Sequence, residues 1–493
     1  MKVLFVTSEA VPFIKTGGLG DVAGALPPAI NKLDKIEIAV VLPYYKKIKE
    51  KYGEFCELIG SFTVSLSWRS EYCGVFKYKY DDNENHLKNK DVHRNIHHVT
   101  FYFIDNEKYF LRDDAYGYYD DGERFAFFSK AVIEMQEYIG YHPDVMHLND
   151  WQTALVPAFL KGHYGHLHEC KRVKTIFTIH NVEYQGQFPD SFFGDVTGLP
   201  GWIKGNLQYG DCINLMAGAI RLSDKVTTVS ETYAEELKTS FFAHGMENLI
   251  REFSYKMTGI LNGIDMDAYD PRKDEVLLPN RFSDKRQLAK SKVKMSLQDK
   301  LGLPVDADVA LVSMVTRLVS HKGIDLLNYI FDELMSRHIQ LVMLGTGDHD
   351  AENKYRGFAD KYQKKFSANI MFDEELAKLI FAASDFFLMP SKTEPCGLSQ
   401  MIAMRYGTVP IVNETGGLKD TVSPVNPETG EGRGFTFKSY NAHDMLNAVD
   451  RALTLFYDDK KMLRTIRANI MTVDFSWYDS AKKYTMLYKE IVK

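Results

Sequence analysis

Three segments in the second half of the chain combine basic side chains, glycines and a carboxylate in a pattern suited to a phosphorylated ligand. Arg317 and Lys322 follow an apolar run that ends at Val315. An arginine fork and a lysine point charge can bind a diphosphate and stabilise its charge as it leaves. The other two segments also follow apolar runs; they are Gly345-Thr346-Gly347-Asp348 and Pro390-Ser391-Lys392-Thr393-Glu394-Pro395-Cys396-Gly397-Leu398. Each segment alone could be a turn, but together they indicate one ligand crevice at the carboxyl ends of parallel strands.

A glycine-rich segment near the N-terminus has similar chemistry. Gly18 to Ala23 formally matches the GxGxxA dinucleotide fingerprint, but the preceding strand-like run ends near Val6, too early for that motif. We therefore exclude a nicotinamide or flavin site. A glycine loop that opens a helix still offers backbone N–H groups to an anion, and Lys15 adds a mobile cation. The segment from Thr16 to Asp21 recurs at 415–420 with one difference, which favours two related halves.

Two histidine-containing segments in the first half follow apolar runs. They are His147-Leu148-Asn149-Asp150-Trp151 and Ile179-His180-Asn181. A lone histidine is usually structural, but His180 ends its run and is followed by polar residues. Such a site can hydrogen-bond sugar hydroxyls while Trp151 or Tyr184 packs against a sugar face.

Other catalytic chemistries lack their signatures. The chain contains no HExxH, GxSxG or GxxxxGK[ST] motif, which excludes the usual metal-hydrolase, serine-esterase and P-loop patterns. Cys396 is interpreted as a small apolar filler rather than a thiol nucleophile. The polar stretch 81–98 holds four histidines without regularly spaced acidic or cysteine partners, so we interpret it as a solvated loop rather than a metal site.

The order of apolar runs predicts two doubly wound α/β domains. Short strand-like runs alternate with helix-like stretches in two series, separated by a charged, irregular region near residues 266–300. The expected strands are 2–6, 36–42, 174–179, 225–229, 310–315, 340–344, 385–389 and 409–412. Residues 475–492 show the spacing of an amphipathic helix with one aromatic face. We expect domains at 1–250 and 251–472, followed by a C-terminal segment at 473–493.

Composition excludes several other classes of protein. The 493 residues include 60 Lys and Arg against 66 Asp and Glu, a net charge of −6. Neither nucleic acid nor an anionic membrane is an expected partner for a chain so close to neutral. Five cysteines without a CxxC pair favour a reduced, cytoplasmic compartment. No apolar stretch is long enough for a membrane span, and the N-terminal residues lack the pattern of a secretory signal.

Taken in order, the motifs resemble those of a known enzyme family. The motifs are KTGGLGDV at 15–22, HLNDWQTALVP at 147–157, TIHNVEYQGQF at 178–188, NGID at 262–265, TRLVSHKGIDLL at 316–327, GTGD at 345–348 and PSKTEPCGLSQMIAM at 390–404. The chain resembles, from end to end, the bacterial glycogen synthases and plant starch synthases that use ADP-glucose. The resemblance implies the GT-B fold, with two Rossmann-like domains facing across a cleft and a C-terminal helix packing back on the first domain.

The same resemblance implies the reaction. Members of the family transfer glucose from ADP-glucose to the non-reducing 4-hydroxyl of an α-1,4-glucan and retain the anomeric configuration. No metal or other cofactor is expected besides this donor, and the expected partners are ADP-glucose and a glucan such as glycogen.

Roles for five catalytic residues follow from the motif matches. Lys15, Arg317 and Lys322 are expected to bind the diphosphate and stabilise the departing ADP in place of a metal ion. Glu394 is expected to hold the glucosyl hydroxyls and favour an oxocarbenium-like transition state. His180 is expected to contact the transferred glucose.

Further matched positions are expected to bind substrate. Asn181 and Asp150 are placed near the transferred glucose, Phe372 against adenine, and the backbone amides at Gly18 and Gly397 near donor oxygens. The remaining expected contacts are Asp21, Trp151, Asn262, Gly345, Cys396 and Leu398.

Two departures bear on the alternatives. Many other retaining GT-B transferases have a second Glu eight residues after the first, whereas this chain has Ile402, which argues against a sucrose- or trehalose-type enzyme. Asn149 stands where some members have His, and we assign it no chemistry.

A phosphorylase would need a pyridoxal-phosphate lysine motif and a longer chain. A non-catalytic glucan-binding homologue would be expected to lack Lys15, Lys322 or Glu394. A UDP-glucose-using synthase of the animal type would lack the N-terminal KTGGLGDV element.

Overall fold

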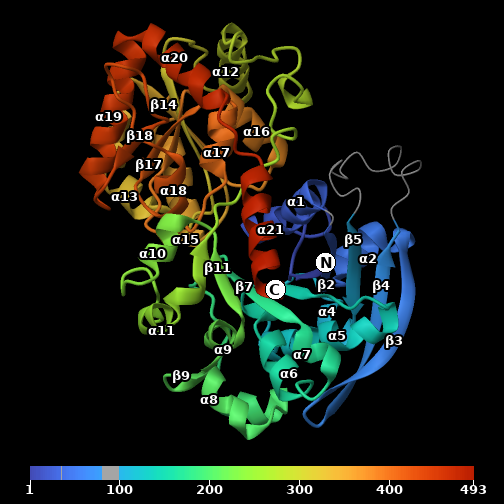
Figure 1. Ribbon diagram of the computed structural model, residues 1–493. Coiled ribbons are helices and arrows are strands. Elements are labelled where there is room, and N and C mark those ends of the chain that lie inside the picture. The colour runs from blue at the N-terminus through green and yellow to red at the C-terminus, as the bar shows by residue number, and fades with distance from the viewer. Residues whose placement is uncertain (35, 80–98) are drawn as a thin grey trace. The chain divides into compact units, whose positions relative to one another are not determined.

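The computed structural model describes residues 1–34, 36–79 and 99–493, and it divides into two units (Figure 1). Unit 1 comprises Met1–Gly263 and Trp477–Lys493, and unit 2 comprises Ile264–Ser476. The first division falls after the expected residue 250 because β12 (Met257–Gly259) pairs in parallel with β11 (Lys225–Thr228) of the first sheet. The second falls at Trp477 rather than 473. The interpretation of 81–98 as a solvated loop concerns residues outside those described.

The main sheet of unit 1 is parallel except at one edge. Its strand order is β12-β11-β7-β6-β1-β2-β5-β4-β3, and only the β5–β4 and β4–β3 pairs are antiparallel. The central strands are apolar and buried, as expected for a sheet covered on both faces. The remaining strands are β1 (Lys2–Val6), β2 (Glu37–Pro43), β3 (Cys56–Leu66), β4 (Arg69–Tyr78), β5 (Thr100–Asp105), β6 (Val145–Asn149) and β7 (Lys174–Ile179).

Helices and a small second sheet complete unit 1. The small sheet is antiparallel and consists of β8 (Gln187–Phe188), β9 (Gln208–Tyr209) and β10 (Cys212–Asn214). The helices are α1 (Gly18–Leu33), α2 (Lys46–Tyr52), α4 (Glu107–Phe110), α5 (Asp121–Ile139), α6 (Val156–Gly162), α7 (His168–Arg172), α8 (Lys204–Leu207), α9 (Leu215–Leu222), α10 (Glu231–Glu236), α11 (Glu247–Glu252) and α21 (Tyr478–Val492).

Unit 2 is a doubly wound α/β unit with a fully parallel sheet. Its order is β15-β14-β13-β16-β17-β18, which is the 3-2-1-4-5-6 order of dinucleotide-binding folds. The strands are β13 (Ala310–Val315), β14 (Ile339–Leu344), β15 (Phe366–Asn369), β16 (Phe386–Met389), β17 (Val409–Asn413) and β18 (Phe435–Phe437). The helices are α12 (Leu288–Lys300), α13 (Ile324–Tyr329), α14 (Phe331–Ser336), α15 (His349–Lys361), α16 (Glu374–Ala383), α17 (Ser399–Arg405), α18 (Gly416–Thr421), α19 (Ala442–Asp458) and α20 (Lys460–Met471).

Each main sheet has a point where the strand order reverses. In unit 1 the neighbouring strands β1 and β6 lie at this point, and in unit 2 the neighbours β13 and β16 do. Loops that leave the carboxyl ends of such strands diverge to opposite faces and leave a crevice for a ligand. The motifs of the two halves therefore lie where α/β folds bind their ligands.

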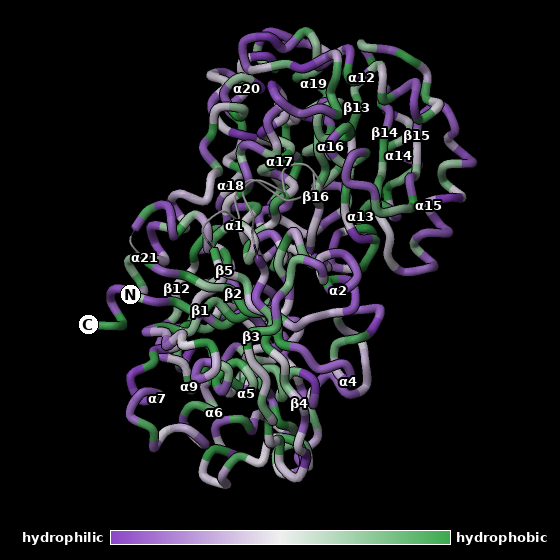
Figure 2. The backbone as a smooth tube through the Cα atoms, turned by 90° about the vertical axis from the view of Figure 1, so that its right-hand side faces the viewer, coloured by the Kyte–Doolittle hydropathy of each residue, from purple (hydrophilic) through white to green (hydrophobic). Residues whose placement is uncertain are grey.

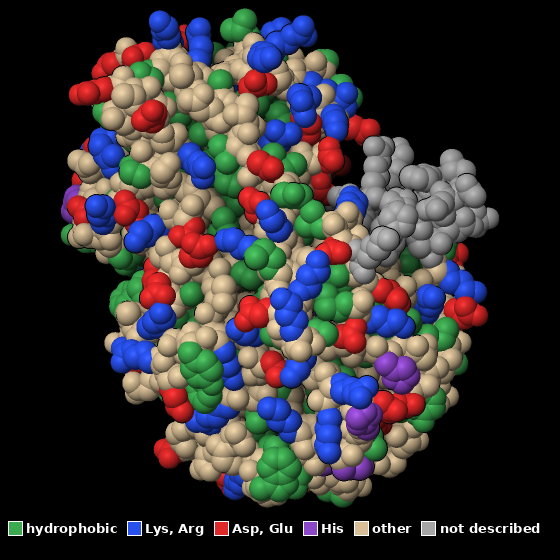
Figure 3. All heavy atoms as spheres, in the orientation of Figure 1, with side chains coloured by type: hydrophobic (Ala, Val, Ile, Leu, Met, Phe, Trp, Pro, Cys, Tyr) green, Lys and Arg blue, Asp and Glu red, His purple; other side chains and the backbone are tan. Residues whose placement is uncertain are grey.

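Hydropathy follows this layering. In Figure 2 the residues along central strands such as β1 and β13 are mostly hydrophobic, and those along α15 are mostly hydrophilic. On the face drawn in Figure 3, basic and acidic side chains are interspersed, in keeping with the net charge of −6. None of the helices in the described parts of the chain has the length and apolar character needed to cross a membrane.

The C-terminal helix α21 belongs to unit 1 and lies beside α1 (Figure 1). Its buried aromatic face was expected from the spacing, and it includes Tyr484 and Tyr488. The Tyr488 hydroxyl lies 2.7 Å from Nδ1 of His147, whose Nε2 lies 2.7 Å from the Thr178 hydroxyl. His147 and Asn149 lie within β6, not after a strand as expected, and His147 is fully buried. His147 therefore ties α21 to the sheet.

Replacing Tyr488 by Phe should destabilise the protein by about 1–3 kcal/mol, because a buried imidazole nitrogen loses its partner. Tyr255→Phe is the matched control, since Tyr255 is in the same unit and is 78% exposed. Thermal unfolding of the two variants measures the difference. Equal melting temperatures would contradict this role for the hydroxyl.

Candidate functional site

An ion pair between a half-buried lysine and a buried glutamate joins two loops at the switch point of unit 2. Lys322 lies at the end of a short 3-10 turn after β13, and Glu394 lies in the loop between β16 and α17. Lys322 Nζ donates to Glu394 Oε2 at 2.7 Å, and the Ser391 hydroxyl donates to the same oxygen at 2.8 Å. The structure thus brings together two residues that are far apart in the sequence.

The ion pair keeps Glu394 charged although it is buried. Burial would raise the pKa of Glu394, but the Lys322 ammonium and the hydrogen bonds from Lys322 and Ser391 hold that pKa below its ordinary value. Within the described ranges no hydrogen bond is made to Oε1. Glu394 can therefore accept a hydrogen bond from a ligand hydroxyl through Oε1.

Close backbone packing holds these loops together. Gly345 has φ +155°, and a Cβ there would lie 1.8 Å from the Thr316 carbonyl oxygen. Gly416 has φ +43°, and a Cβ there would lie 2.0 Å from the Glu394 carbonyl oxygen, which accepts a hydrogen bond from the Gly417 amide at 3.1 Å. Glycine is required at both positions because a side chain would push the loops apart. The repeat of the glycine segment at 415–420 thus supports the loop of Glu394.

The other expected residues of unit 2 differ in accessibility. Arg317 is exposed, and within the described chain no ion pair or side-chain hydrogen bond joins it to another residue. Phe372 is 80% exposed, so its ring face is open to a planar ligand. Cys396 is buried, in keeping with its interpretation as a filler, while Gly397 and Leu398 are half-buried just before α17.

Glu9, which the sequence analysis missed, organises the glycine loop of unit 1. It is 4% exposed and follows β1 after two polar residues. Its Oε2 accepts hydrogen bonds from the Thr16 amide, the Thr16 hydroxyl at 2.9 Å and the Gly17 amide at 3.2 Å. Burial raises the pKa of Glu9, and the bonds from Thr16 partly offset that rise. The sequence did offer one signal for Glu9: a carboxylate that follows an apolar strand-like run after only two residues.

The glycine loop leads directly into α1. The helix begins at Gly18, and the N-cap Gly17 offers no side-chain cap to the first turn. A Cβ on Gly18 would meet nothing within 4 Å, so packing within the protein does not demand glycine there. Backbone N–H groups at such a helix start attract anions. Lys15 Nζ lies 2.8 Å from Asp21 Oδ1, which places these two expected residues together beside the helix start.

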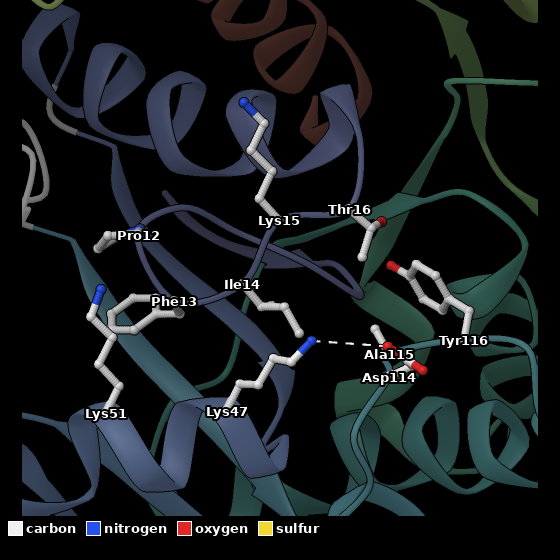
Figure 4. Close-up of a pocket in the computed structure, with 10 residues that line it drawn as sticks. All are labelled: Pro12, Phe13, Ile14, Lys15, Thr16, Lys47, Lys51, Asp114, Ala115 and Tyr116. Carbon is white, nitrogen blue, oxygen red and sulfur yellow. Dashed lines mark ion pairs between the residues drawn. The ribbon is translucent and has the colours of Figure 1, made fainter. Parts of the chain in front are cut away.

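A pocket of about 480 Å³ adjoins this loop within unit 1. Figure 4 shows Lys15 directed toward α1 and Lys47 directed toward Asp114, with which it forms an ion pair at 3.9 Å. The pocket is lined by Pro12, Phe13, Ile14, Lys15, Thr16, Lys47, Lys51, Asp114, Ala115 and Tyr116.

Asp150 lies at the end of β6, opposite the glycine loop across the switch point. Its backbone has φ +57°, which is uncommon for a residue other than glycine and typical of functional sites. Its Oδ1 accepts a hydrogen bond from the His180 amide at 2.7 Å. Burial raises the pKa of Asp150 to about 7, although backbone bonds from His180 and Asn181 lower it and nearby Glu9 raises it further.

His180 follows β7 and is neutral. Its Nε2 lies 2.9 Å from Asn149 Oδ1, and burial lowers its pKa to about 3. Trp151 packs edge-on against Phe125, with ring centroids 5.3 Å apart, so part of its surface is already covered. Tyr184, the other expected sugar-stacking residue, is 51% exposed.

The expected site residues fall into two groups, one in each unit. Lys15, Gly18, Asp21, Asp150, Trp151, His180 and Asn181 lie around the switch point of unit 1, and Arg317, Gly345, Phe372, Glu394 and their neighbours lie at the carboxyl edge of unit 2. Asn262 is buried in the segment after β12, at the end of the first part of unit 1. In the part of the chain that the structure describes, no three His, Cys, Asp or Glu side chains form a group that could hold a metal ion.

Comparisons with known proteins agree with this arrangement. Residues 2–252 match the family model described as starch synthase catalytic domain, and residues 298–469 match that of glycosyl transferases group 1. The chain is 47% identical to a glycogen synthase of Clostridium acetobutylicum and 45% identical to one of Alkaliphilus metalliredigens, each over all of both chains. A solved structure of the catalytic domain of Starch Synthase IV from Arabidopsis thaliana, bound to ADP and acarbose, superposes with a TM-score of 0.86 at 31% identity and 99% coverage of both chains.

The raised pKa of Asp150 predicts how its replacement changes stability with pH. A carboxyl whose folded pKa lies near 7 instead of about 3.9 stabilises the fold at low pH and loses that contribution as the pH rises from about 4 to 7. Asn does not titrate, so Asp150→Asn should gain stability relative to the wild type between pH 4.5 and pH 8, measured by thermal unfolding.

Asp120→Asn is the control of opposite sign. Arg112 pairs with Asp120 at 2.6 Å, and despite the burial of Asp120 this pair lowers its pKa. The Asp120→Asn variant should therefore lose stability relative to the wild type as the pH rises through about 4. A stability difference for Asp150→Asn that does not change with pH would contradict the raised pKa.

Proposed function

The chain belongs to the family of glycogen synthases and starch synthases, and on that premise we propose that it transfers glucose from ADP-glucose to the non-reducing 4-hydroxyl of an α-1,4-glucan. It is a glucosyltransferase of glycogen synthesis with the GT-B fold, and members of its family use a nucleotide-sugar donor and a glucan acceptor. The donor base and the residue roles below are our assignments for this chain. The observation that carries them is the Lys322–Glu394 pair at the switch point of unit 2, with the exposed Arg317 five residues before Lys322.

Arg317 and Lys322 bind the diphosphate of the donor. Arg317 has its guanidinium exposed and can grip two phosphate oxygens at once, and Lys322 adds a point charge five residues later. As the bond to the sugar breaks, negative charge grows on the departing ADP, and these cations stabilise it more strongly than they stabilise the ground state. We assign this role to side chains and assume no metal or other cofactor.

Glu394 orients the glucosyl group. Its Oε1 accepts a hydrogen bond from a sugar hydroxyl, while Lys322 and Ser391 hold Oε2 in place. A carboxylate kept ionised also favours the positive charge that develops on the sugar ring in an oxocarbenium-like transition state. Phe372 stacks on the adenine, and the backbone at Gly345, Gly397 and Leu398 borders the donor.

Retention follows from attack on the same face as departure. The bond between the anomeric carbon and the phosphate oxygen breaks, and the acceptor 4-hydroxyl oxygen forms the new bond on that face. The hydroxyl proton passes to the departing phosphate oxygen, which leaves as ADP. This scheme needs no carboxylate nucleophile and agrees with Glu394 being held in an ion pair.

In unit 1, the glycine loop and the ends of β6 and β7 act on phosphate and sugar. Lys15 and the first amides of α1 offer positive charge to phosphate, and Asp21 holds the Lys15 ammonium between turnovers. His180, Asn181 and Asp150 hydrogen-bond the glucose hydroxyls, and Tyr184 offers an exposed ring to the acceptor. We place the reaction in a reduced, cytoplasmic compartment, which the five cysteines without a CxxC pair favour.

Initial rates with glycogen should show glucan extension from ADP-glucose in excess over UDP-glucose without added metal. The purified protein is assayed with each donor, with and without a chelating agent. Extension from neither donor would contradict the proposed function, and a preference for UDP-glucose would contradict the assigned donor alone.

Replacing Glu394 by Gln should lower kcat about 100-fold to 1000-fold, because the charge that stabilises the transition state is removed while shape and the Ser391 hydrogen bond are kept. Asp450→Asn is the matched control, because it breaks an ion pair with Arg337 in the same unit. Arg337 lies just before the start of β14, whereas Glu394 follows the carboxyl end of β16, so the control lies at the opposite edge of the sheet. Steady-state kinetics on both variants provide the comparison. If kcat fell equally in the two, the role of Glu394 would be structural.

A further inference from the structure

The orientation of the Asn149 side chain is determined by the backbone around it. Its amide nitrogen Nδ2 donates to the Val6 carbonyl at 2.9 Å and lies 3.4 Å from the His147 carbonyl. A carbonyl oxygen can only accept, so the NH₂ group must face these two atoms. The amide oxygen Oδ1 is thereby directed to the other side, where it lies 2.9 Å from Nε2 of His180.

This orientation decides which His180 nitrogen carries the proton. An amide oxygen can only accept a hydrogen bond, so Nε2 must be the N–H of the ring. In a neutral imidazole the other nitrogen, Nδ1, then has a lone pair and no proton. Burial keeps the ring neutral by lowering the pKa of His180 to about 3. Among the described residues, no hydrogen bond is made to Nδ1.

His180 is also held from the backbone. Its amide donates to Asp150 Oδ1 at 2.7 Å, so neighbouring residues at the end of β6 fix both its main chain and its ring. Asn149 is fully buried and does not reach a ligand itself. Its side chain can act on a substrate only through the imidazole.

We infer that Asn149 is a positioning residue that holds His180 as the Nε2–H tautomer, so that Nδ1 serves only as an acceptor for a sugar hydroxyl. The inference rests on the proposed function, because that function brings a sugar to His180. It gives a specificity rule: the sugar must present an O–H donor to Nδ1, and an analogue with hydrogen or fluorine in place of that hydroxyl loses the bond.

The tautomer can be measured directly. Protein labelled with ¹⁵N-histidine is examined by two-bond ¹H–¹⁵N correlation, and His180 is assigned by the signal lost in His180→Gln. In the wild type, His180 should show the pattern of a neutral ring protonated at Nε2. In Asn149→Leu, which has a similar volume and no acceptor, this pattern should give way to a mixture of tautomers. A wild-type ring protonated at Nδ1 would overturn the inference.

Kinetics test the consequence for catalysis. Asn149→Leu should lower kcat/KM for the nucleotide sugar about tenfold to a hundredfold, as expected for loss of an oriented hydrogen bond. Asn149→His should restore most of the activity. A neutral imidazole at position 149 can accept a hydrogen bond from Nε2 of His180 through one ring nitrogen and donate to the Val6 carbonyl through the other. Equal activity of Asn149→Leu and the wild type would overturn the inference.

A control separates positioning from general damage to the fold. Thr153→Val removes a fully buried hydroxyl that lies 3.1 Å from both the Asn149 and the Asp150 carbonyl oxygens, but it leaves the Asn149 amide side chain in place. This variant should keep the His180 tautomer and most of the kcat/KM even if its melting temperature falls. Loss of the tautomer in Thr153→Val as well would assign the effect to local packing and overturn the inference.

The experiments can contradict the proposed function and the role of Asn149 independently. If the wild-type protein extends no glucan from any nucleotide sugar, the proposed function fails whatever the tautomer. If it extends glucan while the signals and rates of Asn149→Leu match those of the wild type, only the role of Asn149 fails.

Discussion

The ion pair between Lys322 and the buried Glu394 is the interaction on which the site of unit 2 depends. A carboxylate that is only 6% exposed would favour its neutral form without a positive partner. The pair forces the loops after β13 and β16 into contact at the switch point of the sheet. That contact in turn requires backbone without a side chain, which explains Gly323: a Cβ there would lie 2.1 Å from the Pro390 carbonyl oxygen.

Unit 1 meets the same constraint in a different way. Its buried carboxylate, Glu9, is satisfied by the Thr16 and Gly17 groups of the glycine loop instead of by a cation. The loop is thereby held at the start of α1, and Lys15 remains beside it, paired with Asp21. In both units a buried carboxylate near a switch point is satisfied by groups of the adjoining loops, and the groups left exposed around it suit phosphates and sugar hydroxyls.

Much of this arrangement could be predicted from local patterns, because parallel strands are continuous buried apolar runs. The expected strands 2–6, 174–179 and 310–315 match β1, β7 and β13 residue for residue, and the segments that follow them hold four of the five expected catalytic residues: Lys15, His180, Arg317 and Lys322. The β3–β4 hairpin was not predicted, since its alternating pattern differs from the buried runs. Glu9 and Asn149 were missed because their roles come from contacts across the sheet, to Thr16 and to His180. The spacing of residues along the chain does not indicate such contacts.

The central claim is that the diphosphate and Glu394 share the charge of Lys322, and ADP binding measured by calorimetry tests it most directly. Lys322→Met should weaken ADP binding about tenfold to a hundredfold, the effect of losing one charge-assisted hydrogen bond. Glu394→Gln should leave ADP affinity unchanged or raise it, because the amide no longer competes for the ammonium. Weakening of ADP binding by Glu394→Gln to the same extent as by Lys322→Met would contradict the account.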